Sequence, residues 1–166
     1  GPRSIVLSVE LPAEEMAQVA EPWGGRGFDV FACGRPEGMT LEHCVLSAAF
    51  DRVVTTCRDL CVQKHPNVSI TDPAGYTFPV ATDSACRNRL LHSRPIEGGE
   101  YLPRLWRGGI RHFRLLFNVA GDPIANVVAG YRAMLDELAA GERVSTDRVR
   151  ALYGQSFTRG HFARAV

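Results

Sequence analysis

Strand-like and helix-like patterns alternate along most of this chain, and a cysteine-rich stretch interrupts the alternation. Short apolar runs at 3–9, 28–33 and 110–117 are rich in the β-branched and aromatic residues that favour strands. With the helical patterns between and after them, the order is β-α-β, then the interruption, then α-β-α-α. This order is typical of an α/β fold whose parallel strands are joined by right-handed crossovers.

The helices are expected from their end signals and apolar faces. Pro12 suits the first position of one helix, and 99–109 reads as a second helix closed by glycine. Asp122 is expected to be the N-cap of the clearest amphipathic helix, at 124–138. Ser145 is expected to cap a last short helix.

The length of the chain limits how much of a barrel it can supply. A complete (β/α)₈ barrel needs roughly 250 residues, and this chain has 166. We therefore predict an α/β fold resembling part of a TIM barrel, with a cysteine-bearing hairpin insertion at about 44–86. Turn residues at 71–75 predict the hairpin. Gly1-Pro2 matches a tag-cleavage scar, and we expect the natural chain to extend upstream of it. The remaining residues, 3–166, are expected to form a single domain.

Charge and hydropathy exclude several classes of partner. A net charge of +1 gives no general attraction to nucleic acid or to anionic membranes. No apolar run has the length of a transmembrane helix and no signal peptide is present, so a cytoplasmic protein is expected. A half barrel leaves sheet edges unpaired, which predicts a homo-oligomer, a partner subunit or a missing N-terminal half.

Four of the five cysteines lie in the interrupting stretch, at Cys44, Cys57, Cys61 and Cys86. Thiolates are soft ligands that suit both iron–sulfur clusters and zinc. Their spacing matches neither the compact ferredoxin run nor a paired zinc ribbon, and cysteine is also a common buried residue. Shared metal binding and core thiols therefore both stay open. Cys33 lies inside a strand-like run and is expected in the core.

Other polar residues give weaker indications. His43 directly precedes the first of these cysteines and suits a mixed Cys/His zinc site. His161, in an Arg-Gly-His sequence, suits an anion contact. Asp51 and Asp83 are candidates for acid/base roles beside the cysteines. Gly24-Gly-Arg-Gly27 precedes a strand, so it predicts a turn and not a nucleotide cradle.

Several short segments together resemble the collagenase-like peptidase family. They are 34–44, the pair Cys57 and Cys61, 76–83 with Cys86, 101–105, and 109–114 followed by a helix with Tyr131-Arg132. The resemblance extends from about Ser4 to Tyr153. It implies that the chain corresponds to the C-terminal half of a TIM-barrel-like domain.

The resemblance also implies a cofactor and a chemistry. Several relatives are oxygen-independent hydroxylation proteins that act on RNA bases or ubiquinone precursors and hold a [4Fe–4S] cluster through four cysteines. The positions that match are Cys44, Cys57, Cys61 and Cys86. Zinc is the alternative cofactor. A metal-dependent peptidase, or a non-catalytic domain with structural zinc or free thiols, are the alternative functions.

One segment departs from the family pattern. Relatives often carry a Lys-Ile-Glu-Gly-Arg-like segment after the strand that here spans 113–118. Leu116, Phe117 and Asn118 stand in that region, so the acidic residue is missing. An activity that depends on that carboxylate is not expected of this chain.

Overall fold

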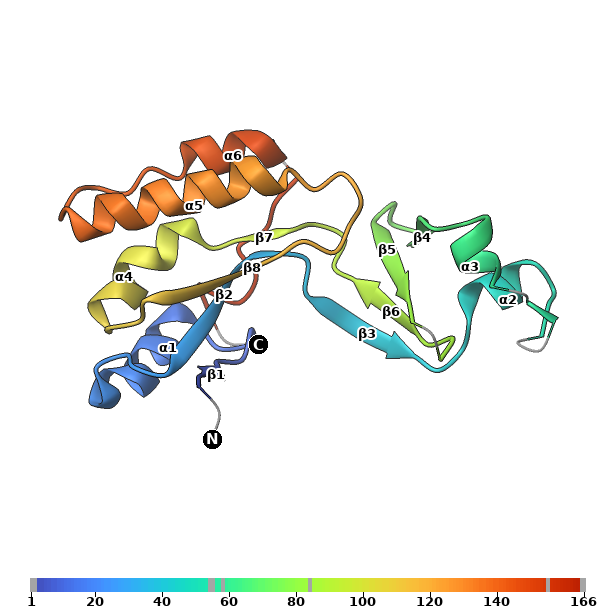
Figure 1. Cartoon of the computed structure of the whole chain (residues 1–166), viewed down its shortest axis with the longest axis horizontal. Coiled ribbons are helices and arrows are strands. Elements are labelled where there is room, and N and C mark those ends of the chain that lie inside the picture. Colours follow the sequence, from blue (N-terminus) through green and yellow to red (C-terminus); the bar gives the residue numbers. More distant parts are fainter. Residues whose placement is uncertain (1–2, 54–55, 58, 84, 155, 165–166) are drawn as a thin grey trace. The chain divides into compact units, whose positions relative to one another are not determined.

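The computed structural model describes residues 3–53, 56–57, 59–83, 85–154 and 156–164. They form a mixed α/β fold with two compact units (Figure 1). The α/β unit consists of Gly1–Gly34, Arg94–Phe117 and Gly121–Val166, and the cysteine unit consists of Arg35–Ser93 and Asn118–Ala120.

The α/β unit contains an open four-stranded sheet around β2 (Phe28–Gly34). β2 pairs in parallel with β1 (Ile5–Val6) and β8 (His112–Leu116), as predicted, and antiparallel with β7 (Ile96–Glu97). The antiparallel β7 was not predicted. It enters the sheet without a preceding crossover helix, and an antiparallel strand needs none. The described strands form two open sheets and do not close into a barrel.

The helices of the α/β unit agree with the predicted ones in place and type. They are α1 (Ala13–Ala20), α4 (Leu102–Arg107), α5 (Ile124–Ala139) and α6 (Asp147–Tyr153), with 3₁₀ turns at Glu21–Trp23 and Gly99–Tyr101. α1 packs against α4, and α5 packs along α6 (Figure 1). Within the described residues, no helix combines the length and the apolar character needed to cross a bilayer.

Four local predictions were wrong. Pro12 occupies the N-cap position of α1, one residue before the first helical position that was predicted for it. The first strand covers only β1 and is exposed, because it is short and pairs with one neighbour alone. Pro123, not Asp122, occupies the N-cap position of α5, where Asp122 accepts the Ile124 N–H through its backbone oxygen at 2.8 Å. Thr146, not Ser145, occupies the N-cap position of α6, and neither cap makes a side-chain hydrogen bond.

Two apolar clusters form the core of the α/β unit. One lies between α1, β2 and α4, and the other between β2, α5 and α6. Their fully buried members include Met16, Val30, Leu105 and Ile110 in the first, and Cys33, Leu102, Val127, Met134 and Val149 in the second. The core position predicted for Cys33 is therefore confirmed.

A buried carboxylate links these clusters. Glu97 on β7 is fully buried and accepts hydrogen bonds from the Gly99 N–H (2.7 Å), the Tyr131 hydroxyl (3.0 Å) and Arg150 Nε (3.1 Å). Burial, together with the neighbouring Cys33 and Glu97, raises the pKa of Tyr131, so its hydroxyl stays a donor. Each oxygen of this buried charge therefore has a partner, as a stable interior requires.

The glycine-rich segment before β2 is a tight turn, as predicted. Gly25 has φ +72°, and a Cβ there would lie 1.9 Å from the carbonyl carbon of Gly109. The backbone of a second turn occupies that space. Close backbone approach and not phosphate binding explains the glycines.

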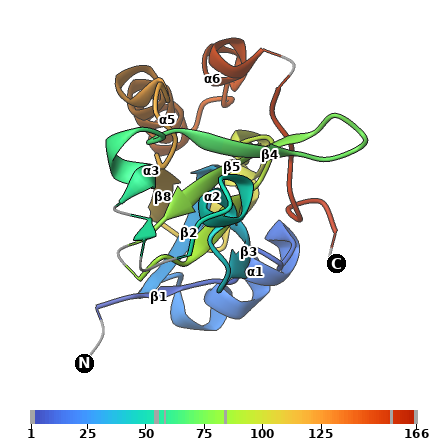
Figure 2. The same ribbon diagram turned by 90° about the vertical axis from the view of Figure 1, so that its right-hand side faces the viewer.

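The cysteine unit is built on a fully antiparallel sheet. Its strand order is β3-β6-β5-β4, with bounds Glu37–Leu41, Asn88–Leu91, Thr77–Thr82 and Val68–Thr71. Two short helices, α2 (Val45–Ala49) and α3 (Leu60–Gln63), precede the β4–β5 hairpin (Figure 2). β4 and β5 pair across the predicted turn. β3 and β6 were not predicted, because neither shows regular alternation of apolar residues.

Candidate functional site

The four cysteines predicted to bind metal all lie in the cysteine unit, outside the strands of its hairpin. Cys44 occupies the N-cap position of α2 and is buried, while Cys57 precedes α3 and is half-buried. Cys61 lies within α3, and Cys86 lies between β5 and β6, both half-buried. Two connections and two short helices thus carry the thiols.

Asn88 joins two of the cysteine-bearing segments. Its fully buried side chain accepts the N–H of Val45, next to Cys44, at 3.0 Å. It also donates to the backbone oxygen of Cys86 at 3.2 Å. One amide therefore fixes the start of α2 to the β5–β6 connection.

The thiol of Cys44 lies among hydrogen-bond donors. Burial alone would raise its pKa, but the N–H groups of Ser47 and Leu46, with the side chains of Ser47 and Asn88, outweigh burial and lower the pKa of Cys44. A lowered thiol pKa favours the thiolate, which is the form that binds metal.

The β5–β6 connection presents Cys86 by means of Asp83. Asp83 Oδ1 accepts the N–H groups of Ala85 (2.9 Å) and Arg87 (3.0 Å), and Asp83 Oδ2 forms a 2.9 Å ion pair with Arg87. Burial opposes ionisation, but these donors lower the pKa of Asp83. The predicted acid/base role of Asp83 is therefore replaced by a structural one, since its oxygens are used by the turn. Cys86 itself has φ 61°, a left-handed conformation that is unusual outside glycine.

The thiol of Cys86 lies within electrostatic range of the other three thiols of the cysteine unit. Burial raises the pKa of Cys86, and the charges of Cys44, Cys57 and Cys61 raise it further. In the described part of the chain, no set of three or more His, Cys, Asp or Glu side chains is close enough to hold a metal ion. The structure thus gathers the cysteines into one region without placing them at ligating distances from a common point.

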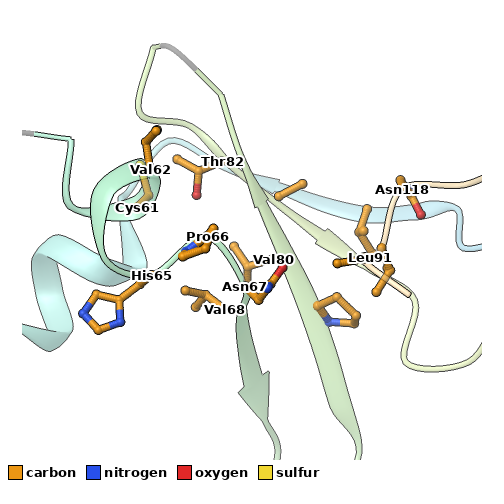
Figure 3. A pocket seen from close by; sticks show the side chains of 14 residues that line it. Cys61, Val62, His65, Pro66, Asn67, Val68, Val80, Thr82, Leu91 and Asn118 are labelled. Carbon is orange, nitrogen blue, oxygen red and sulfur yellow. The ribbon is translucent and has the colours of Figure 1, made fainter. Parts of the chain in front are cut away.

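A cavity of about 400 Å³ adjoins this region (Figure 3). Cys61 and His65 line it on one side and Asn118 lines it on the other, with apolar residues between them. The His65 ring stacks on Phe50 at 4.8 Å between centroids. Asn118 donates to the backbone oxygen of Arg35 at 3.0 Å, which holds 118–120 in this unit.

Comparison with known proteins settles the family. The model of Peptidase family U32 matches residues 1–165. The chain belongs to peptidase family U32. No curated protein and no solved structure is significantly similar to it. The resemblance to the collagenase-like peptidases is therefore confirmed over nearly the whole chain.

Other predicted site residues of this U32 family member do not gather with the cysteines. His43 is exposed, and Asp51 is exposed with φ 49° at the end of α2. In the α/β unit, Arg159, two residues before His161, pairs with Glu100 at 2.9 Å. The anion contact expected at His161 stays a prediction.

The sequence analysis did not identify three polar residues that link segments or line the cavity in the cysteine unit. Asn88 and His65 carry no pattern that marks them, since their roles depend on segments that are distant in the sequence. Asn118 stood out only as a departure from the family pattern, and the structure places it on the cavity wall.

Proposed function

We propose that the cysteine unit binds a [4Fe–4S] cluster and that the protein serves oxygen-independent hydroxylation or related redox chemistry. The proposed ligands are Cys44, Cys57, Cys61 and Cys86. The observation that carries the proposal is that all four thiols lie in the cysteine unit, where Asn88 joins the segment of Cys44 to that of Cys86 by hydrogen bonds of 3.0 and 3.2 Å. A [4Fe–4S] cluster commonly takes four thiolates and supplies one-electron redox chemistry when bound.

The donor set fits a cluster better than it fits other metal groups. Four sulfur ligands suit an iron–sulfur cluster or tetrahedral zinc, whereas catalytic zinc sites usually include histidine or carboxylate ligands and keep an open position. His43 and Asp51, the other predicted candidates in the cysteine unit, are exposed. The donor set therefore supports a cluster or structural zinc over a hydrolytic zinc centre.

The residues around the thiols have defined tasks under this proposal. The donors around Cys44 stabilise its thiolate, and Asn88 keeps Cys44 and Cys86 in the same neighbourhood. Asp83 fixes the turn that presents Cys86. The fold already restricts the positions of these cysteines, so less conformational entropy is lost when the cluster binds.

Metal and sulfide content after anaerobic purification tests the proposal. We expect about four irons and four acid-labile sulfides per chain with broad visible absorbance, the content of one [4Fe–4S] cluster. One zinc without sulfide would instead favour a structural zinc. Protein that binds neither metal, even after anaerobic reconstitution with iron and sulfide, would refute the proposal.

Two matched variants locate the ligands. Cys57→Ser is expected to lose most of the bound iron, because serine oxygen is a poorer ligand for the cluster than thiolate. Cys33→Ser, in the α/β unit, is expected to keep the iron content of the wild type. Equal loss in both variants would point to unfolding and not to ligation.

A further inference from the structure

A cavity of about 250 Å³ lies in the α/β unit, at the amino ends of the paired parallel strands β2 and β8 (Figure 1). Its lining comes from the two turns that precede these strands, with residues from 25–28 and from 109–112. The turns touch there, since a Cβ on Gly25 would lie 1.9 Å from the carbonyl carbon of Gly109. The glycines thus set the contact between the turns, and the side chains beside them set the chemistry of the cavity.

The lining of this cavity is cationic. Its polar side chains are Arg26, Arg111 and His112, and none of the described residues that line it is acidic. Within the described part of the chain, neither of these arginines has a carboxylate partner, whereas Arg104 and Arg114 each have one. The charges of Arg26 and Arg111 are therefore available to a ligand.

Arg111 is held in place before any ligand binds. Its Nη1 donates to the backbone oxygens of Trp106 (2.6 Å) and Ile110 (3.0 Å), and its guanidinium lies 3.8 Å from the centre of the Trp106 ring. These hydrogen bonds use one of its three nitrogens, so donors remain for a ligand. A guanidinium that is already fixed loses little conformational entropy when it binds an anion.

His112 supplies the third polar group. Its Nδ1 lies 3.4 Å from Oδ1 of the buried Asp29, whose charge Arg114 balances at 2.8 Å. The other ring nitrogen, Nε2, remains for a ligand and donates when the ring is protonated. The two arginines match the charge of a phosphate monoester, which is about −1.5 to −2 at pH 7.

We propose that this cavity binds one phosphate group, as the free ion or as a monoester. The phosphate oxygens accept hydrogen bonds from Arg26 and Arg111, in the forked geometry that guanidinium groups offer to oxyanions. The site is independent of the proposed cluster, because all of its residues belong to the α/β unit. The small volume suits one phosphate and a few attached atoms, whereas an RNA chain needs a series of cations along its backbone.

Nuclear magnetic resonance titration at constant ionic strength tests the site. Inorganic phosphate and glycerol 3-phosphate are the probes, and sodium chloride and glycerol are the matched controls without phosphate. We expect both probes, and neither control, to shift the backbone amides of Gly27, Gly109 and His112 saturably. Equal shifts with sodium chloride, or no saturable shift at these turns with any phosphate compound, would overturn the proposal.

A soluble ester and a lipid headgroup both present a phosphate monoester, and a vesicle arm separates these sources. Vesicles of phosphatidylcholine with phosphatidic acid that bind the protein through Arg26, while both soluble probes fail, would identify the headgroup as the source. A single-stranded RNA without a terminal phosphate that shifts the same amides at lower concentration than glycerol 3-phosphate would overturn the proposal.

Charge variants assign the effect to the cavity. Arg26→Glu is expected to abolish saturable binding because it places a carboxylate in the lining, and Arg26 is exposed, so the fold should persist. Arg26→Lys keeps the charge but not the fork and should weaken binding by no more than about tenfold. Arg143→Glu makes the same charge change at an exposed position outside the lining and should retain the wild-type affinity. Equal loss of binding in Arg26→Glu and Arg143→Glu would show only general charge attraction and would overturn the proposal.

Discussion

Two buried thiols, one in each unit, have pKa values that are shifted in opposite directions. Cys33 in the α/β unit is fully buried, and burial, with help from the charge of Glu97, raises its pKa to about 11. Cys44 in the cysteine unit is also buried, yet its pKa is lowered because backbone and side-chain donors surround it. Burial therefore does not decide what a cysteine can do. The groups that face the sulfur decide it.

The same contrast holds for the polar residues that stabilise each unit. The α/β unit uses one buried carboxylate with three donors, and the cysteine unit uses one buried amide between two loops. The first network joins β7 to two helices, whereas the second joins segments that carry proposed ligands. The four experiments below test this difference.

The largest effect is expected from Glu97→Ala. The change removes the acceptor of the Gly99 N–H and of Arg150 Nε and leaves the Tyr131 hydroxyl only the Ala32 backbone oxygen, and we expect a loss of about 3 kcal/mol in the free energy of unfolding. Urea denaturation measures it, with the exposed Glu142→Ala as the control. A loss as small as that of the control would show that the network contributes little.

Asn88→Ala is expected to cost less stability but to affect metal binding. Two half-buried backbone groups, the Val45 N–H and the Cys86 oxygen, lose their hydrogen bonds, for a cost of about 2 kcal/mol. Because Asn88 joins the segments of Cys44 and Cys86, iron uptake should also fall, whereas Asn126→Ala, at an exposed position of α5, should leave both quantities unchanged. Normal iron uptake by Asn88→Ala would show that the Asn88 amide is not needed to position the proposed ligands.

The pH dependence of stability should have opposite signs at the two thiols. The raised pKa of Cys33 means that the unfolded thiol ionises first, so its contribution is present below the ordinary thiol pKa and is lost as pH rises toward 11, by about 1–2 kcal/mol between pH 8 and pH 10. The lowered pKa of Cys44 means that its contribution is present above the ordinary thiol pKa and is lost as pH falls through the folded value.

This comparison is measured on metal-free protein as the stability of the wild type minus that of each Cys→Ala variant. The difference for Cys33→Ala should shrink as pH rises, and the difference for Cys44→Ala should grow. Slopes of the same sign would show that burial alone governs both sulfurs.

The smallest effects are expected at exposed ion pairs, where the two units should behave alike. Glu14 pairs with Arg104 in the α/β unit, and Glu37 pairs with Arg89 in the cysteine unit, at 2.6 and 2.7 Å. Solvent screens both pairs, so Glu14→Gln and Glu37→Gln should each change the melting temperature no more than other exposed substitutions do. Thermal denaturation in low and high salt measures it. A larger change in either unit would reveal a buried role that the exposure of these side chains does not suggest.

Local patterns in the sequence were sufficient to predict the α/β class, the helices, the β4–β5 hairpin and the family. Helix periodicity, proline and glycine positions and β-branched runs act within a few residues, so they can be interpreted without the rest of the chain. The sequence also marked the four cysteines and placed Cys33 in the core, because residue type and local apolar context carry that information.

The way these elements pair and pack could be seen only once the chain was folded. The antiparallel β7, the strands β3 and β6, the Asn88 link and the cavity wall at Asn118 all depend on segments tens of residues apart. The different states of the Cys33 and Cys44 thiols depend on which donors and charges surround each sulfur. Those surroundings are set by long-range packing, and no local pattern in the sequence encodes them.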